Sequence, residues 1–153
     1  MKIETKEIGK RINGFSGVCR RYGVKVTHQR TEVYRELAST DEHPDAETVY
    51  TRVRKRIPTI SLDTVYRTIR LLEKKGLISR VGSLGEKTRF DANPNHHHHF
   101  VCTECGFMGD FYNEEWNDFR VPGDLTAIGK VNSVHVELRG LCKVCQRKRI
   151  DKR

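Results

Sequence analysis

Two Cys-x-x-Cys pairs constrain the second half of this 153-residue chain more than any other feature. They are Cys102-x-x-Cys105 and Cys142-x-x-Cys145. A Cys-x-x-Cys turn places two thiolates on one side of a metal ion, and two such turns close a tetrahedron with no open position, as in structural Zn²⁺ sites. Four free or redox-active thiols are the alternative. We expect one zinc ion, bound by all four cysteines, to hold together a small domain with a thin apolar core.

The charge distribution separates the chain into unlike halves. The formal net charge is +9, and apolar residues make up 36% of the sequence. Positive charge is concentrated in residues 1–86 and 147–153, whereas residues 87–146 have a slight acidic excess. This pattern is typical of a phosphate-binding domain joined to a different domain, although a solvated basic surface would give the same totals. Without an apolar signal segment or a membrane-length stretch, we expect a cytoplasmic location and no membrane partner.

In the first half of the chain, apolar residues recur at helix spacing and then give way to the pattern of two short strands. Ser61 is placed to cap the clearest helix, which Gly76 would end. Residues 77–92 predict two short strands around a Gly-containing turn. The last three of the four predicted helices, followed by a hairpin, indicate a winged helix-turn-helix, in which the helix from Ser61 to Lys75 would enter the DNA major groove. Apolar residues at helix spacing predict helices over residues 3–22, 28–40, 46–57 and 61–75.

The helix over 61–75 divides into an apolar stripe and a polar face. The stripe, which we expect to be buried, consists of Leu62, Val65, Ile69 and Leu72. The candidates for contact with double-stranded operator DNA lie outside this stripe: Thr64, Tyr66, Arg67 and Arg70.

Beyond Asp91 the apolar pattern changes to that of short strands. The candidate strands are HHFVC, FMGDFYN and SVHVELRGLC, and EEWNDF is expected to form one short helix. We therefore predict an α+β chain of two domains and a tail. The predicted parts are a winged-helix domain over residues 1–86, a small α/β domain over 87–146, and a basic disordered tail over 147–153.

Four consecutive histidines stand directly before the first cysteine pair. In a strand, His97 and His99 point to one face while His96 and His98 point to the other. Cys102 lies an odd number of positions from His99, so it nominally faces away from the His97/His99 pair. The strand thus offers a two-histidine site that is separate from the zinc site. His96 and His98 are expected to be exposed polar residues.

Two imidazoles are too few to hold a metal ion well, so carboxylate partners are needed. Asp91 precedes the histidine run, and Asp110 could return on the next strand. Imidazoles combined with carboxylates suit Fe²⁺ or Mn²⁺, and Zn²⁺ less selectively. His43 lies in DEHPDA at a helix start, where a histidine is usually solvated, so spacing alone does not recruit it.

Several motifs, taken together and in order, resemble the ferric uptake regulator (Fur) family of metal-dependent repressors. The motifs are THQR, HPDAETVY, SLDTVYRTIRLLEKKGLI, TRFD, HHHHFVCTECG and the second Cys-x-x-Cys pair. The resemblance covers nearly the whole chain. It implies a winged helix, a C-terminal α/β dimerisation domain, and a homodimer that binds a palindromic operator. It also implies a regulatory metal site at His43, Asp91, His97, His99 and Asp110.

Within this family, the aspartate at position 110 resembles the peroxide-sensing (PerR) branch. That branch oxidises a metal-bound histidine with Fe²⁺ and H₂O₂, and the corresponding positions here are His43 and His97. The resemblance therefore implies a transcriptional repressor that senses peroxide. Because the Tyr66-Arg67 pair is common among iron sensors too, a repressor of metal uptake genes that responds to iron or zinc remains the alternative.

Other classes of protein fit the sequence less well. His135-x-Glu137 before Cys142 superficially echoes a zinc deaminase signature, but the two halves lie too close together for a helix to fit between them. No phosphate-binding loop or Ser/His/Asp order is present, so we do not expect an enzyme. A proton sensor would need no carboxylates beside its histidines. The sequence assigns no role to Cys19, which we expect to be buried, or to His28.

Overall fold

The computed structural model describes residues 5–82, 87–117, 120–132 and 134–151. The chain divides into two compact units, Met1–Pro94 and Asn95–Arg153. Strand β2 pairs with β1 and lies within the first of these units. Residue 86 itself, where the boundary was predicted, lies outside the described residues. No helix in the described part of the chain is long and apolar enough to span a membrane.

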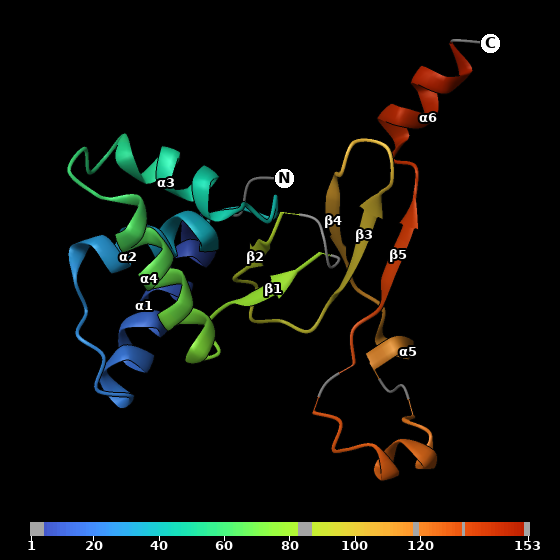
Figure 1. Ribbon diagram of the computed structural model, residues 1–153, viewed down its shortest axis with the longest axis horizontal. Helices are drawn as coiled ribbons and strands as arrows, with labels where there is room; N and C mark the ends of the chain where they lie inside the picture. The colour runs from blue at the N-terminus through green and yellow to red at the C-terminus, as the bar shows by residue number, and fades with distance from the viewer. Residues whose placement is uncertain (1–4, 83–86, 118–119, 133, 152–153) are drawn as a thin grey trace. The chain divides into compact units, whose positions relative to one another are not determined.

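The first unit begins with four helices, coloured blue to green in Figure 1. Three of them start at polar N-caps, because the Thr27, Asp45 and Ser61 side chains each accept a hydrogen bond from a backbone N–H in the first turn. Gly76, at φ 72°, follows the last helix, as predicted. The helices are α1 (Thr5–Arg21), α2 (His28–Ala38), α3 (Ala46–Arg54) and α4 (Leu62–Lys74).

Strands β1 (Ser79–Val81) and β2 (Arg89–Asp91) follow as an antiparallel pair, which together with the helices confirms the winged helix-turn-helix. The predicted turn between them falls at residues 83–86, outside the described residues. In the pair, Arg80 lies opposite Phe90 and Ser79 opposite Asp91. This register places Asp91 at the end of β2.

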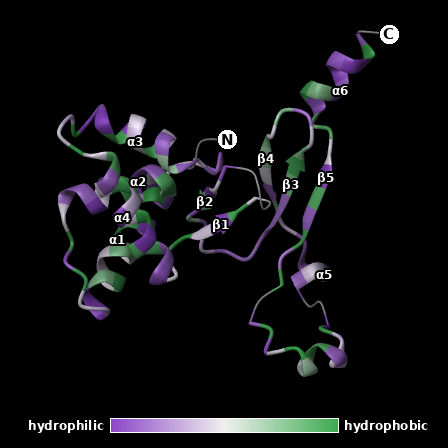
Figure 2. Ribbon diagram, in the orientation of Figure 1, coloured by the Kyte–Doolittle hydropathy of each residue, from purple (hydrophilic) through white to green (hydrophobic). Residues whose placement is uncertain are grey.

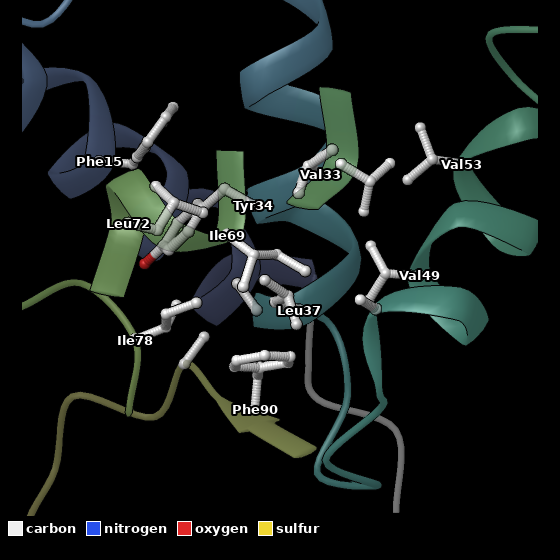
Figure 3. Packing of buried hydrophobic residues seen from close by; sticks show 14 of the residues in the cluster. Phe15, Val33, Tyr34, Leu37, Val49, Val53, Ile69, Leu72, Ile78 and Phe90 are labelled. Atoms are coloured by element: carbon white, nitrogen blue, oxygen red, sulfur yellow. The ribbon is translucent and has the colours of Figure 1, made fainter. Parts of the chain in front are cut away.

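The core of the first unit lies between the four helices and the hairpin (Figure 3). Phe15 stacks on Tyr34, with ring centroids 4.6 Å apart. Three members of the predicted α4 stripe are buried, whereas Leu62 at the first turn is only partly buried. The core side chains labelled in Figure 3 are Phe15, Val33, Tyr34, Leu37, Val49, Val53, Ile69, Leu72, Ile78 and Phe90.

The second unit is built on a three-stranded sheet of order β4-β3-β5. The central strand β3 (His98–Cys102) pairs antiparallel with β4 (Met108–Phe111) and parallel with β5 (Glu137–Gly140). The short helix α5 (Glu114–Asn117) and a 3₁₀ segment (Gly123–Ala127) come between β4 and β5. This confirms the predicted mixture of short strands and one short helix.

The C-terminal tail is ordered further than predicted. Helix α6 spans Lys143–Ile150, so the prediction of disorder from Arg147 onward is wrong for the described part of the tail. The side chain of Cys145 is buried in the first turn of α6 and anchors the helix. The remaining side chains of α6 are exposed, and most of the helix is hydrophilic (purple in Figure 2). Its basic composition suggested disorder, but the anchored cysteine was a local signal for order.

Candidate metal centres

The four cysteines meet because two parallel strands end at the same edge of the sheet. Cys102 is the last residue of β3 and pairs in register with Gly140 at the end of β5. The turn after β3 brings in Cys105, and the chain after β5 brings in Cys142 at the start of α6. Cys145 follows in the first turn of α6. The topology therefore unites two motifs that lie far apart in sequence.

The spacing of the four sulfurs fits a tetrahedral metal ion. Their Sγ atoms all lie within 4.8 Å of one another, and the Sγ atoms of Cys105 and Cys142 are 3.8 Å apart. Zn–S bonds of about 2.3 Å in a tetrahedron require S···S distances of about 3.8 Å. All four are free cysteines rather than disulfides. The cluster fits structural Zn²⁺, as the sequence predicted.

The electrostatics of the cluster also favour a cation. Backbone N–H groups of Cys142 and Cys105 point at the Cys102 sulfur and lower the pKa of this thiol to about 6. The Cys142 N–H donates to this sulfur over 3.3 Å. By contrast, loss of solvent raises the pKa of Cys145. Four thiolates at this point therefore need a positive ion, and Zn²⁺ supplies that charge.

The second unit also places His97, His99 and Asp110 together. His99 lies directly opposite Asp110 in the antiparallel pair of β3 and β4. The Nε2 atoms of His97 and His99 are 3.0 Å apart, and they lie 3.6 and 3.5 Å from the Asp110 carboxylate. The predicted parity therefore holds, since both imidazoles share one face and the returning strand supplies the carboxylate.

The tautomer of His97 suits metal binding. Its Nδ1 lies 2.7 Å from the carbonyl oxygen of Asn95, which can only accept, so Nδ1 carries the proton and donates. The Nε2 lone pair of neutral His97 is then directed at His99 and Asp110. Metal-bound histidines typically have their other nitrogen held in this way. Two imidazoles and one carboxylate form a donor set suited to Fe²⁺ or Mn²⁺.

His43 and Asp91 lie together within the first unit. His43 Nε2 is 4.0 Å from Asp91 Oδ1, and both side chains are buried. His43 has a φ of 52°, in the left-handed region that side-chain-bearing residues rarely adopt. Asp91 Oδ1 accepts a hydrogen bond of 2.8 Å from the backbone N–H of Asn93. The sequence suggested that a histidine at this helix start would be solvated, but its side chain is buried, and the loop that carries it is bonded to β2 through Pro44 and Asp45.

The four predicted DNA-contact residues lie on α4. The Thr64 hydroxyl is 2.8 Å from that of Ser61 at the helix start, and Tyr66 is 37% exposed. Arg67 and Arg70 are exposed, and Arg67 forms an ion pair of 2.8 Å with Asp63 on the same face. This face therefore offers hydrogen-bond donors and positive charge to a ligand.

The predicted exposure of His98 is wrong, because this side chain is completely buried. Its ring packs against Phe111 and Trp116, with centroids 5.5 and 5.7 Å away, and its Nδ1 accepts a hydrogen bond of 3.3 Å from the Val136 N–H. The face of β3 opposite the metal-ligand candidates is thus a small core of its own. The covering residues, Phe111 at the end of β4 and Trp116 in α5, lie more than ten positions away along the chain, so alternation along the strand did not reveal them. The expected exposure of His96 holds.

Cys19 is buried in α1, as expected, and takes part in the core of the first unit. Burial raises the pKa of its thiol, and the nearby Arg30 offsets only part of this effect. It therefore behaves as a small core residue rather than a reactive thiol.

Comparison with known proteins places this geometry among metal regulators. The model of the ferric uptake regulator family matches residues 21–122. The peroxide-responsive repressor PerR of Staphylococcus aureus is 29% identical over 148 residues, covering 97% of this chain and all of that protein. The Campylobacter jejuni peroxide stress regulator superposes with a TM-score of 0.65 at 31% identity, over 82% of this chain and 95% of that one. The Helicobacter pylori ferric uptake regulator superposes with a TM-score of 0.71 at 24% identity, over 95% and 97%, and supports the fold.

Proposed function

Because this chain belongs to the ferric uptake regulator family, we propose that it is a metal-dependent repressor that binds double-stranded operator DNA as a homodimer. Helix α4 enters the major groove, and Thr64, Tyr66, Arg67 and Arg70 contact the DNA. The exposed positive face of this helix and the formal net charge of +9 support this role. The protein acts by binding rather than by catalysis, and it acts where operator DNA lies, in the cytoplasm.

One metal ion regulates DNA binding in this proposal. Its ligands are His43, Asp91, His97, His99 and Asp110. If one ion were bound by all five residues, it would fix the angle between the units, and the two α4 helices of a dimer would then match the operator spacing. The observation that carries this proposal is the convergence of the His97 and His99 Nε2 atoms and the Asp110 carboxylate, with His97 held in the ligand tautomer by Asn95.

The signal is hydrogen peroxide, acting on the Fe²⁺-loaded protein. Hydrogen peroxide would transfer one oxygen atom to the imidazole of His43 or His97, and its second oxygen would leave as water. Fe²⁺ held by these ligands would supply the metal chemistry that activates the peroxide. An oxidised imidazole is a poorer ligand, so the metal leaves and the repressor releases its operator. The relatives named for their response to peroxide, in S. aureus and C. jejuni, support this proposal.

A repressor of metal uptake genes that responds to iron or zinc is the second candidate. The observation that favours it is the donor set itself, because imidazole and carboxylate ligands bind Fe²⁺, Mn²⁺ and Zn²⁺ with only modest selectivity.

Operator binding by the Fe²⁺-loaded and Mn²⁺-loaded proteins, with and without H₂O₂, separates the two candidates. A peroxide sensor loses DNA affinity only in the iron form, and mass spectrometry finds one added oxygen on His43 or His97. The exposed His28 and His96 are internal controls that remain unmodified. If the iron form keeps its DNA affinity and no histidine gains oxygen, the peroxide proposal is wrong. Dependence of DNA binding on added Fe²⁺ or Zn²⁺ alone then favours the metal sensor.

A further inference from the structure

The loop before α3 is attached to the wing strand by a side chain that sequence reasoning did not single out. Arg89, the first residue of β2, donates from Nε to the carbonyl oxygen of His43 over 2.7 Å. Its Nη2 donates to the carbonyl oxygen of Glu42. One guanidinium therefore holds two successive carbonyls of the loop.

The backbone joins the same two segments. The Phe90 N–H donates to the Pro44 carbonyl over 3.2 Å, and Asp45 and Arg89 form an isolated antiparallel bridge. On its other side, the loop is held by the Glu42 carboxylate, which accepts a hydrogen bond of 2.7 Å from Arg52 on α3. The segment carrying His43 is thus fixed from both β2 and α3.

We call the Arg89 guanidinium and the two carbonyls that it holds, those of Glu42 and His43, the Arg89 clamp. This clamp holds His43 in an unusual backbone conformation. A φ of 52° is costly for a residue with a side chain and persists only where the surroundings enforce it. Two adjacent carbonyls converging on one planar donor group provide such enforcement, and the rigid fork of an arginine fits them better than the point charge of a lysine.

The clamp also sets the geometry of two ligand candidates at once. Arg89 lies two residues before Asp91 on the same strand, so fixing the loop to Arg89 fixes His43 relative to Asp91. The resulting separation of 4.0 Å between His43 Nε2 and Asp91 Oδ1 brings two candidate ligand atoms together within the first unit.

We propose that Arg89 is a positioning residue for the regulatory metal, which holds His43 at its left-handed backbone conformation and ties it to the strand that carries Asp91. Arg89 does not touch the metal; it acts through the carbonyls of Glu42 and His43. This inference rests on the proposed function of His43 and Asp91 as ligands. Because β2 belongs to the wing, metal binding and wing position become coupled through this side chain.

The test uses the full-length, zinc-containing protein and four variants: Arg89→Ala, Arg89→Lys, Arg80→Ala and His43→Ala. Arg80 is the matched control, because it lies on the paired strand β1 and bonds the Glu73 carboxylate at 2.5 Å instead of the loop. Mn²⁺ affinity is measured by electron paramagnetic resonance titration, operator affinity at increasing Mn²⁺ by fluorescence anisotropy, and folding by thermal unfolding. Loss of an outer-shell partner typically weakens metal binding by roughly 10- to 100-fold.

We expect Arg89→Ala to weaken Mn²⁺ binding by roughly 10- to 100-fold. Once Mn²⁺ is saturating, this variant should bind the operator as the unmodified protein does. Arg89→Lys should lie between Arg89→Ala and the unmodified protein, which keeps the test valid if the alanine variant unfolds. Arg80→Ala should bind Mn²⁺ as the unmodified protein does.

Two results would overturn the inference. Unchanged Mn²⁺ affinity in both Arg89 variants, with affinity lost in His43→Ala, refutes the positioning role but leaves the proposed function intact. Reduced operator affinity at saturating Mn²⁺, with a shallower salt dependence, would make Arg89 a phosphate contact instead. If His43→Ala binds Mn²⁺ normally, the proposed ligand set itself is wrong.

Discussion

Replacing Cys142 with serine should unfold the second unit, because one zinc ion contributes more to its stability than the apolar core does. Structural zinc contributes about 10–16 kcal/mol in small zinc-dependent domains, and the net stability of whole domains is about 5–15 kcal/mol. Apart from cysteines, the buried hydrophobic side chains among the described residues of this unit are Val101 and Met108. Each contributes roughly 1.5–3 kcal/mol, so together they cannot replace the ion.

The single tryptophan of the chain provides a selective assay. Trp116 packs against His98 and Phe111 inside the second unit, so its fluorescence reports on this unit alone. We expect Cys142→Ser to lose zinc, to shift the Trp116 emission toward that of exposed tryptophan, and to elute as a monomer. Chelation of zinc from the unmodified protein should produce the same spectrum.

Cys19→Ala is the matched control, because it removes the cysteine that lies outside the cluster. It should keep one zinc per chain and an unchanged tryptophan spectrum. A Cys142→Ser protein that retains zinc, the native emission and its dimeric state would refute the argument that the metal holds this unit together.

Two further perturbations test the first unit. Arg67→Ala should weaken operator binding by roughly 1–3 kcal/mol and reduce the preference for operator over random DNA, if the exposed Arg67 reads a base edge; unchanged affinity at moderate salt would exclude that role. Although burial by itself raises the pKa of Glu32, hydrogen bonds from Arg56 (2.7 Å) and Arg35 (3.0 Å) lower it overall. The pKa of Glu32 in the folded state therefore lies below its unfolded value near 4.5. The ionised carboxylate thus stabilises the fold above pH 4.5, and this stabilisation is lost as the pH falls through the folded-state pKa. The free energy of unfolding of Glu32→Gln, from urea titrations, should therefore fall less steeply on acidification below pH 4.5 than that of the unmodified protein, and parallel curves would contradict this.

In the proposed mechanism, the two candidate metal centres play different physical roles. The four sulfurs form a closed site that needs nothing beyond the second unit. The second site offers a metal ion one nitrogen atom from each of His97 and His99, together with the carboxylate of Asp110 on β4. In the proposed mechanism only the second site exchanges its ion, so a stable zinc and a labile regulatory metal can coexist in one small domain.

Local periodicity in the sequence was enough to predict much of this protein. Caps at Thr27 and Ser61, the buried stripe of α4 and the shared face of His97 and His99 all follow from backbone geometry over a few residues. Each Cys-x-x-Cys pair likewise specified two thiolates at one turn. These features need no knowledge of distant parts of the chain.

Only the tertiary structure decided which of these local features meet. The parallel pairing of β3 with β5 brought Cys102 beside Cys142, and the register of β3 with β4 set Asp110 opposite His99. Packing buried His98, whose neighbours in sequence do not reveal that Trp116 covers it. Strand order, register and packing depend on contacts between distant residues, and sequence periodicity carries no information about those contacts.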